Sequence, residues 1–138
     1  MRVVSNALYQ AIRFSGLYHE RSAVSPDYMV KVGREVGRHM NCRTLRELVN
    51  QCEGLGLGAL EVHHWDATGM TLELRNCSCD GLPPVDRCVC DFEAAVLEGA
   101  LAGLLSKTPG DEVVVKEVRC SLSGHSICQF EAHFVETP

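Results

Sequence analysis

The sequence contains no lysine- or arginine-rich run, no long apolar stretch and no signal-peptide core. Its 13 lysine and arginine residues are outnumbered by 18 acidic ones, for a net charge of −5, so the basic footprint of a nucleic-acid-binding protein is missing. No apolar run approaches the roughly 18 residues that a membrane span needs. The N-terminus alternates polar and apolar residues, unlike the apolar region of a signal peptide. We therefore expect a cytoplasmic protein that binds neither nucleic acid directly nor a membrane.

Internal repeats, low-complexity segments and nucleotide-binding fingerprints are also missing. Glycines alternate at positions 54, 56 and 58, but they follow a predicted helix and precede a predicted strand, which is the reverse of a dinucleotide-binding turn. The 138 residues, 46% hydrophobic and 22% charged, are ordinary for a globular protein and sufficient for one domain with its own core.

Cysteine, by contrast, is abundant: eight are found, at positions 42, 52, 77, 79, 88, 90, 120 and 128. In a small secreted protein such a count would suggest a disulfide framework. Because this chain has no export signal and can form its own core, metal ligation or buried free thiols are favoured instead. We expect Cys42 and Cys52, at the two ends of a short predicted helix, to be ordinary buried cysteines.

Hydrophobic spacing and capping signals predict helices first and then mostly strands. A helix is expected over 3–18, and Ser25-Pro26-Asp27 has the composition of a helix start. Thr44 to Glu47 fits a capping box. Gly33 and Gly37, one helical turn apart, indicate close packing against another backbone. Five later elements are predicted: two strands of a hairpin over 59–66 and 70–76, a Gly/Ala-rich helix over 91–105, a strand from Val113 to Cys120, and a strand beginning at Cys128.

The last third of the chain has the spacing of a metal site. Cys120 and Cys128 lie at the two ends of a hairpin turn, and Cys90 precedes the Gly/Ala-rich helix. Glu117 comes three residues before Cys120, so a bend or bulge at the strand end could place its carboxylate beside the thiols. Four such ligands would close the coordination of a structural Zn²⁺, and we expect Arg87, Lys116 or Arg119 nearby to offset the negative charge. The alternative is a solvated Glu117 with core cysteines.

The loop 76–90 holds further cysteines in two C-x-C pairs, which leaves Cys77, Cys79 and Cys88 to be explained. They could form a second metal or Fe–S site, act as a redox pair, or serve as alternative ligands for the first ion. The spacing does not match that of ferredoxins, so we rank an Fe–S cluster below zinc. No C-x-x-C lies at a helix start, which weakens a thiol-redox function.

These residues resemble the 4-vinyl reductase (4VR) domain family. The resemblance covers roughly residues 24–135. It depends on Cys90, on Gly99 nine residues later, and on Glu117-x-x-Cys120-x-x-x-Gly124-x-x-x-Cys128-x-Phe130. Two departures are Ala95, where the family usually has glycine, and the additional loop cysteines.

The resemblance implies an α+β domain over 24–138, preceded by an N-terminal helix or arm over 1–23. Its N-terminal helices would pack on a mainly antiparallel sheet of about four strands, with the Gly/Ala-rich helix before the last two. It also implies that Cys90, Glu117, Cys120 and Cys128 bind zinc, beside a pocket for a hydrophobic effector, often in a homodimer. We expect the pocket to be lined by five residues: Tyr28, His64, Trp65, Phe92 and Val96.

Three functions follow from these observations. The first is a zinc-stapled sensor, regulatory or carrier domain for a hydrophobic or aromatic small molecule, acting through a protein partner. The second is an accessory factor or subunit in tetrapyrrole 4-vinyl reduction. The third is an Fe–S or thiol-redox protein using the loop from Cys77 to Cys90. A closed metal site leaves no activated water, and Ser123 with His125 has no third residue to orient a nucleophile–base pair, so we favour a protein without catalytic activity.

Overall fold

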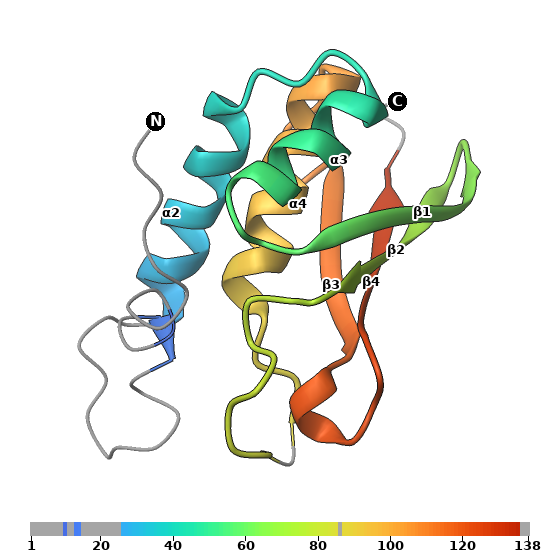
Figure 1. Ribbon diagram of the computed structural model, residues 1–138. Helices are drawn as coiled ribbons and strands as arrows, with labels where there is room; N and C mark the ends of the chain where they lie inside the picture. Colours follow the sequence, from blue (N-terminus) through green and yellow to red (C-terminus); the bar gives the residue numbers. More distant parts are fainter. Residues whose placement is uncertain (1–9, 11–12, 15–25, 86, 136–138) are drawn as a thin grey trace.

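The computed structural model describes Gln10, Arg13, Phe14, residues 26–85 and residues 87–135. The helix predicted over 3–18 and the arm predicted over 1–23 therefore fall almost wholly outside the described residues. Within residues 26–135, helices α2 (Pro26–His39), α3 (Leu45–Gly54) and α4 (Asp91–Leu105) precede or connect the strands. The strands are β1 (Ala59–Asp66), β2 (Gly69–Arg75), β3 (Val113–Arg119) and β4 (Cys128–Phe134), with a short 3₁₀ turn η2 (Ser121–Ser123) between the last two (Figure 1).

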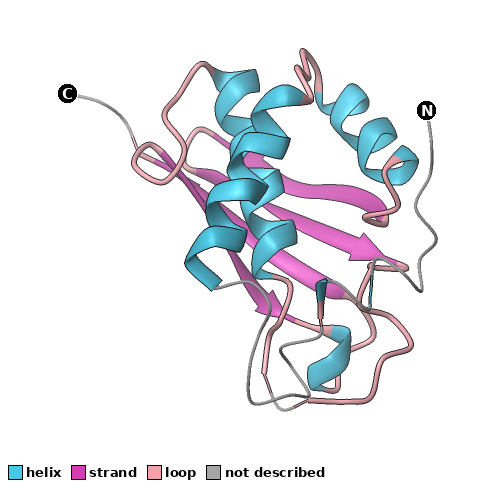
Figure 2. Cartoon of the chain, turned by 90° about the vertical axis from the view of Figure 1, so that its left-hand side faces the viewer, coloured by secondary structure: helices cyan, strands magenta, loops and turns pink. Residues whose placement is uncertain are grey.

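The four strands form one antiparallel sheet in the order β1-β2-β4-β3, and the helices cover one face of it (Figure 2). Alternate residues of β2 and β4 face these helices, where Met70, Leu72 and Leu74 pair with Ala132, Phe130 and Cys128. All six are buried. The prediction of an α+β domain with a mainly antiparallel sheet is confirmed. Among the described residues, no helix has the length and hydropathy that a bilayer crossing requires.

Helix α4 lies between α2 and the sheet, and glycines set its distance from α2. A Cβ on Gly37 would overlap the backbone of Val96, and one on Gly99 would overlap the backbone of Arg34. A Cβ on Gly33 would lie 2.7 Å from that of Ala95. The predicted close approach at Gly33 and Gly37 is thus a crossing of two helices. Since the glycine face of α2 makes this contact, the apolar Val36 on another face is left exposed.

Local signals fixed the helix ends well. Thr44 is the N-cap of α3, and its hydroxyl accepts a hydrogen bond from the backbone N–H of Glu47 (3.1 Å). The Glu47 carboxylate in turn accepts one from the N–H of Arg43 (2.7 Å), the residue before the N-cap, so side chains at both ends of the first turn hold the backbone in place. Pro26 begins α2 and Asp91 begins α4, both as predicted.

The β1–β2 hairpin departs from simple alternation. The pairing of β1 with β2 shifts between His63 and Asp66, and His64 has a left-handed φ of 50°. The shift turns His64 and Trp65 outward, and both side chains are exposed. An unbroken alternation would have placed His64 on the buried face with Leu60.

Candidate metal centre

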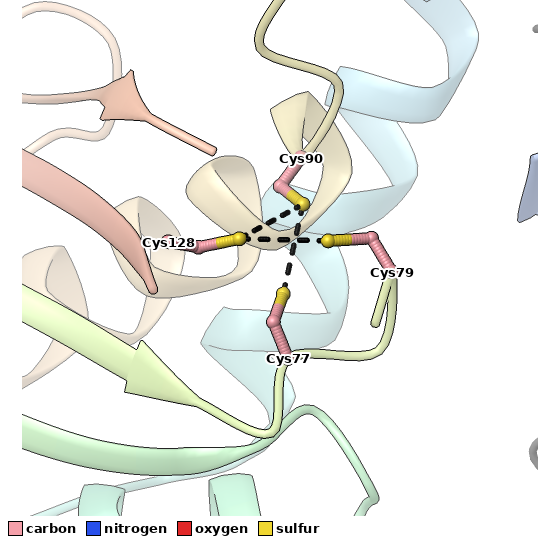
Figure 3. A group of neighbouring side chains, drawn as sticks. All are labelled: Cys77, Cys79, Cys90 and Cys128. Carbon is pink, nitrogen blue, oxygen red and sulfur yellow. Dashed lines mark hydrogen bonds between the residues drawn. The ribbon is translucent and has the colours of Figure 1, made fainter. Parts of the chain in front are cut away.

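A cluster of buried cysteines lies at one end of the sheet, beside the N-terminus of α4. Cys77 and Cys79 come from the loop after β2, Cys90 is the N-cap of α4, and Cys128 is the first residue of β4. Their sulfurs point toward one another (Figure 3). Each residue is at most 3% exposed, so segments that are distant in sequence meet in a space shielded from solvent.

The sulfur separations suit a shared metal ion better than disulfides. The Sγ atoms of Cys77 and Cys90 are 3.6 Å apart, those of Cys79 and Cys128 3.5 Å, and those of Cys90 and Cys128 3.9 Å. A disulfide needs an S–S distance of about 2.05 Å. Four sulfurs at about 2.3 Å from a tetrahedral Zn²⁺ would be about 3.8 Å apart. All four sulfurs lie within 4.8 Å of one another, so the cluster is able to hold one metal ion.

The ligand set predicted from the sequence is also brought together. Cys90, Glu117, Cys120 and Cys128 each place one donor atom within 4.8 Å of the other three. The backbone N–H of Cys90 donates a hydrogen bond to Oε1 of Glu117 (2.8 Å). Oε2 of Glu117 is buried, and the described residues offer it no hydrogen-bond partner. A buried carboxylate oxygen without a donor is costly, and it is the type of atom that a cation would satisfy.

A β-bulge makes this second set possible. Residues three apart on a regular strand point to opposite faces, which would separate Glu117 from Cys120. In the structure Glu117 pairs with Phe130, but Arg119 pairs with Gln129, so the register shifts at Val118. The additional residue turns Cys120 to the same face as Glu117. The bend or bulge that the sequence argument required is present.

The cluster shifts the pKa values of its members in opposite directions. Contact with the Cys120 thiol and its neighbours lowers the pKa of Cys128 to about 5. Burial raises the pKa of Glu117 to about 8, although the N–H of Cys90 acts against this. Contacts with Cys120 and the other thiols, together with burial, raise the pKa of Cys90. Some donors therefore stay protonated at neutral pH until a cation compensates their charge.

Of the three loop cysteines, two belong to a candidate ligand group and one does not. Cys77 and Cys79 join Cys90 and Cys128 in the first group, which is one of the alternatives that the sequence left open. Cys88 is exposed and belongs to neither group. The C-x-C spacing was the available signal for Cys77 and Cys79, but the path of the loop decides which sulfurs converge. Arg87, Lys116 and Arg119, expected near the site, all have exposed side chains.

A groove of about 450 Å³ adjoins the cluster between α2, α4 and β3. Its walls include Val30 and Arg34 of α2, Ala94 and Glu98 of α4, and Val115 of β3. Cys88 and Glu117 also line it, so one predicted metal ligand belongs to both the cluster and the groove. The volume is within the range of about 300–1,000 Å³ that is typical of small-molecule sites.

The predicted pocket residues do not line this groove. Tyr28 and Trp65 are more than half exposed, and His64 is exposed as well. Phe92 is partly buried against the core, and Val96 is fully buried within it. Sequence reasoning did not name Arg34 and Glu98, which form an ion pair at the groove wall. Glu98 also accepts a hydrogen bond from the N–H of Val115 (3.1 Å), so it ties α4 to β3.

Comparisons with known proteins match part of this chain to a family. Residues 71–134, which carry all six candidate ligands, match the V4R domain. An uncharacterised protein of Methanocaldococcus jannaschii is 27% identical over 136 residues, covering 98% of this chain and 81% of that protein. A second uncharacterised protein of the same organism is 30% identical over 106 residues, covering 76% of this chain and 55% of that protein.

Solved structures share the fold. A vinyl-4-reductase family protein from Methanocaldococcus jannaschii matches with a TM-score of 0.74 and 20% identity, over 99% of this chain and 85% of that one. The phenol-responsive sensory domain of the transcription activator PoxR, solved with phenol, matches with a TM-score of 0.77 and 13% identity, over 97% of this chain and 76% of that one. A trafficking protein particle complex subunit 3 from Naegleria fowleri, covalently bound to palmitic acid, matches with a TM-score of 0.67 and 15% identity, over 95% of this chain and 93% of that one. The match over residues 71–134 thus identifies a V4R domain, as the cysteine and glutamate motif predicted, and the solved structures show that the fold is shared.

Proposed function

We propose that this chain is a small-molecule-binding sensor, regulatory or carrier domain, stapled by zinc and specific for a hydrophobic or aromatic ligand. The observation that carries the proposal is the convergence of buried thiolate donors beside a groove whose wall includes Glu117. Thiolates select zinc over hard cations such as Mg²⁺ and Ca²⁺. Four protein ligands fill a tetrahedral site, so the ion holds the loop, α4 and the β3–β4 hairpin together and leaves no position for a reacting water.

The groove is suited to a mostly apolar ligand. Val30, Ala94, Ala95 and Val115 supply apolar walls, while the paired Arg34 and Glu98 supply a few polar atoms that could fix its orientation. A phenol-bound sensory domain and a palmitoylated trafficking subunit share the fold. We therefore take an aromatic alcohol and a fatty acid as the first ligand classes to test.

We further propose that the protein acts as a homodimer in the cytoplasm and passes its signal to a protein partner. Its eight cysteines are all free, which suits a reducing compartment. Val36, left exposed by the glycine crossing, lies with Val32 in a shallow apolar depression on α2. A second copy of the chain is the partner we propose for that face.

The test compares two tryptophan substitutions on α2. Val30→Trp fills the groove, whereas Arg38→Trp adds the same side chain at an exposed position of α2 outside both the groove and the apolar depression. Phenol and palmitate binding to the zinc-loaded protein are measured by calorimetry. We expect at least one probe to bind the wild type and Arg38→Trp, and to bind Val30→Trp at least about tenfold more weakly. Equal binding by Val30→Trp would contradict the groove as the site.

A role in tetrapyrrole 4-vinyl reduction is the second candidate, favoured by the match to a vinyl-4-reductase family protein. A visible absorption spectrum of protein purified without reductant or chelator separates the candidates. A spectrum without visible bands, together with bound zinc, supports the zinc-stapled domain. Visible bands from a tetrapyrrole support the second candidate, and bands from a cluster support the Fe–S alternative.

A further inference from the structure

The two candidate ligand groups are parts of one continuous cluster. Cys77 and Cys79 complete one group, and Glu117 and Cys120 complete the other. Cys90 and Cys128 belong to both. The cluster thus has six donors in all, four of them around two shared sulfurs, and those sulfurs are 3.9 Å apart.

One ion cannot use all six donors. A tetrahedral ion takes four ligands, so either group leaves two donors of the other behind. The residues left behind would be deeply buried, since Cys77 is 3% exposed, and Cys79 and Cys120 are 0% exposed. If the ion occupies the four-cysteine group, Oε2 of Glu117 also stays buried without a hydrogen-bond partner among the described residues. A single ion therefore accounts for only part of the cluster.

We propose that the cluster holds two divalent ions, with the thiolates of Cys90 and Cys128 bridging them. Six protein ligands complete two four-coordinate ions only when two are shared, as in the Zn₂Cys₆ type of module. The separation of 3.9 Å between the shared sulfurs is close to the edge of about 3.8 Å expected for a ZnS₄ tetrahedron. It can serve as the common edge of two tetrahedra.

Charge balance favours the second ion. Six ionised donors around two divalent ions carry a net formal charge of two negative units, the same as four thiolates around one ion. With one ion, ionising all six would leave four negative units in a space closed to water, which is costly. The second ion thus allows Glu117 and Cys120 to ionise without adding net charge.

Backbone groups also favour the bridging positions. Cys90 is the N-cap of the 15-residue helix α4, where the helix dipole stabilises negative charge. The N–H of Ser121 donates to the Cys128 sulfur at 3.5 Å. Both shared sulfurs therefore have polar support in addition to the ions themselves.

The inference rests on the proposed zinc coordination, and counting ions separates the two proposals. The protein is purified without chelator, loaded with Zn²⁺ under reducing conditions, and its bound zinc is counted by native mass spectrometry. We expect two ions per chain in the wild type and in Cys88→Ser, whose exposed thiol belongs to neither group. We expect one ion in Cys79→Ser and one in Cys120→Ser, because each substitution removes a ligand that is not shared.

Cadmium provides a readout of the bridge itself. In protein loaded with ¹¹³Cd²⁺, we expect two resonances that both couple to the β-protons of Cys90 and of Cys128. One ion per chain in the wild type, or two ions without shared coupling, overturns the dinuclear centre and leaves the proposed zinc staple standing. No bound ion at all overturns both proposals.

Discussion

Glu117 is the residue at which burial and metal binding oppose each other. Removal from water raises the pKa of this carboxyl group to about 8 from an ordinary value of 4.5. Between these values the folded, metal-free chain keeps a proton that the unfolded chain has released. The stability contributed by protonated Glu117 is therefore complete below about pH 4.5 and is lost as the pH rises through about 8.

Glu117→Gln should remove this pH dependence. In the metal-free, reduced state we expect the wild type to lose stability relative to the variant as the pH rises from about 5 to about 9. Urea unfolding followed by circular dichroism measures the difference at each pH. Glu131→Gln, at an exposed position on β4, should track the wild type. A constant gap between the wild type and Glu117→Gln across this range would show that Glu117 is ionised throughout.

At the scale of single elements, the bulge in β3 controls which side chains can meet. Deletion of Val118, the half-exposed residue at the register shift, should restore regular pairing and leave Glu117 and Cys120 two residues apart, so that they still share a face. Insertion of one alanine after Val118 should instead turn Cys120 away from Glu117, because the bulge absorbs only one additional residue. We expect the insertion variant to bind less zinc than the wild type, while the deletion variant and Val118→Ala bind as much. Native mass spectrometry of zinc-loaded protein gives the readout, and unchanged zinc in the insertion variant would show that the facing of these two ligands is dispensable.

The crossing of α2 and α4 gives a second prediction at this scale. Gly37→Ala should lower the free energy of unfolding by about 1–3 kcal/mol, because the new methyl group would overlap the Val96 backbone. Gly103→Ala is the matched control on α4, where a Cβ meets no atom within 4 Å. It should raise stability by about 0.5–1 kcal/mol through helix propensity. Urea unfolding distinguishes them, and equal effects would contradict the close crossing.

Sequence reasoning succeeded wherever the determining signal was local. The Pro26 start, the Thr44 cap and the alternation of Met70, Leu72 and Leu74 all act within a few residues, and the structure confirms each of them. Features that depend on contacts between distant parts of the chain could not be predicted in the same way. A strand pattern does not show the shift after His63 that exposes His64, because the shift depends on pairing with the neighbouring strand.

In the candidate site, too, local spacing was informative and contacts between distant segments were not predictable. Cys120 and Cys128 could be paired from their positions around one turn. Cys77 and Cys79 could be named but not placed, because the loop after β2 is held by contacts with residues that are distant in sequence. One is the hydrogen bond from the N–H of Val85 to the carbonyl of Leu122 (2.9 Å). The groove residues Val30 and Arg34 could not be named from the sequence, because their position depends on which face of α2 packs against α4. The close contacts at Gly33 and Gly37 determine that face.

For the whole molecule, the cluster joins the loop after β2, the start of α4, and both strands of the last hairpin. Structural metal binding contributes directly to folding free energy. Chelation under reducing conditions should therefore lower the midpoint of thermal unfolding by at least about 10 °C, since a chain of this size shifts by about 3 °C for each kcal/mol. Zinc should restore it. Differential scanning calorimetry measures the shift, and an unchanged midpoint after complete metal removal would exclude a staple.

The strand order also has a consequence for how the protein is made. β4 occupies an inner position of the sheet, between β2 and β3, yet of these four strands it is the last to leave the ribosome. Until β4 is synthesised, the edge of β2 that will pair with it is open. Cys77, Cys79 and Cys90 also lack the fourth sulfur of their group, that of Cys128. Such long-range pairing slows folding. Newly synthesised chains therefore pass through a stage with exposed thiols and an open sheet edge, when oxidation or aggregation is the main hazard.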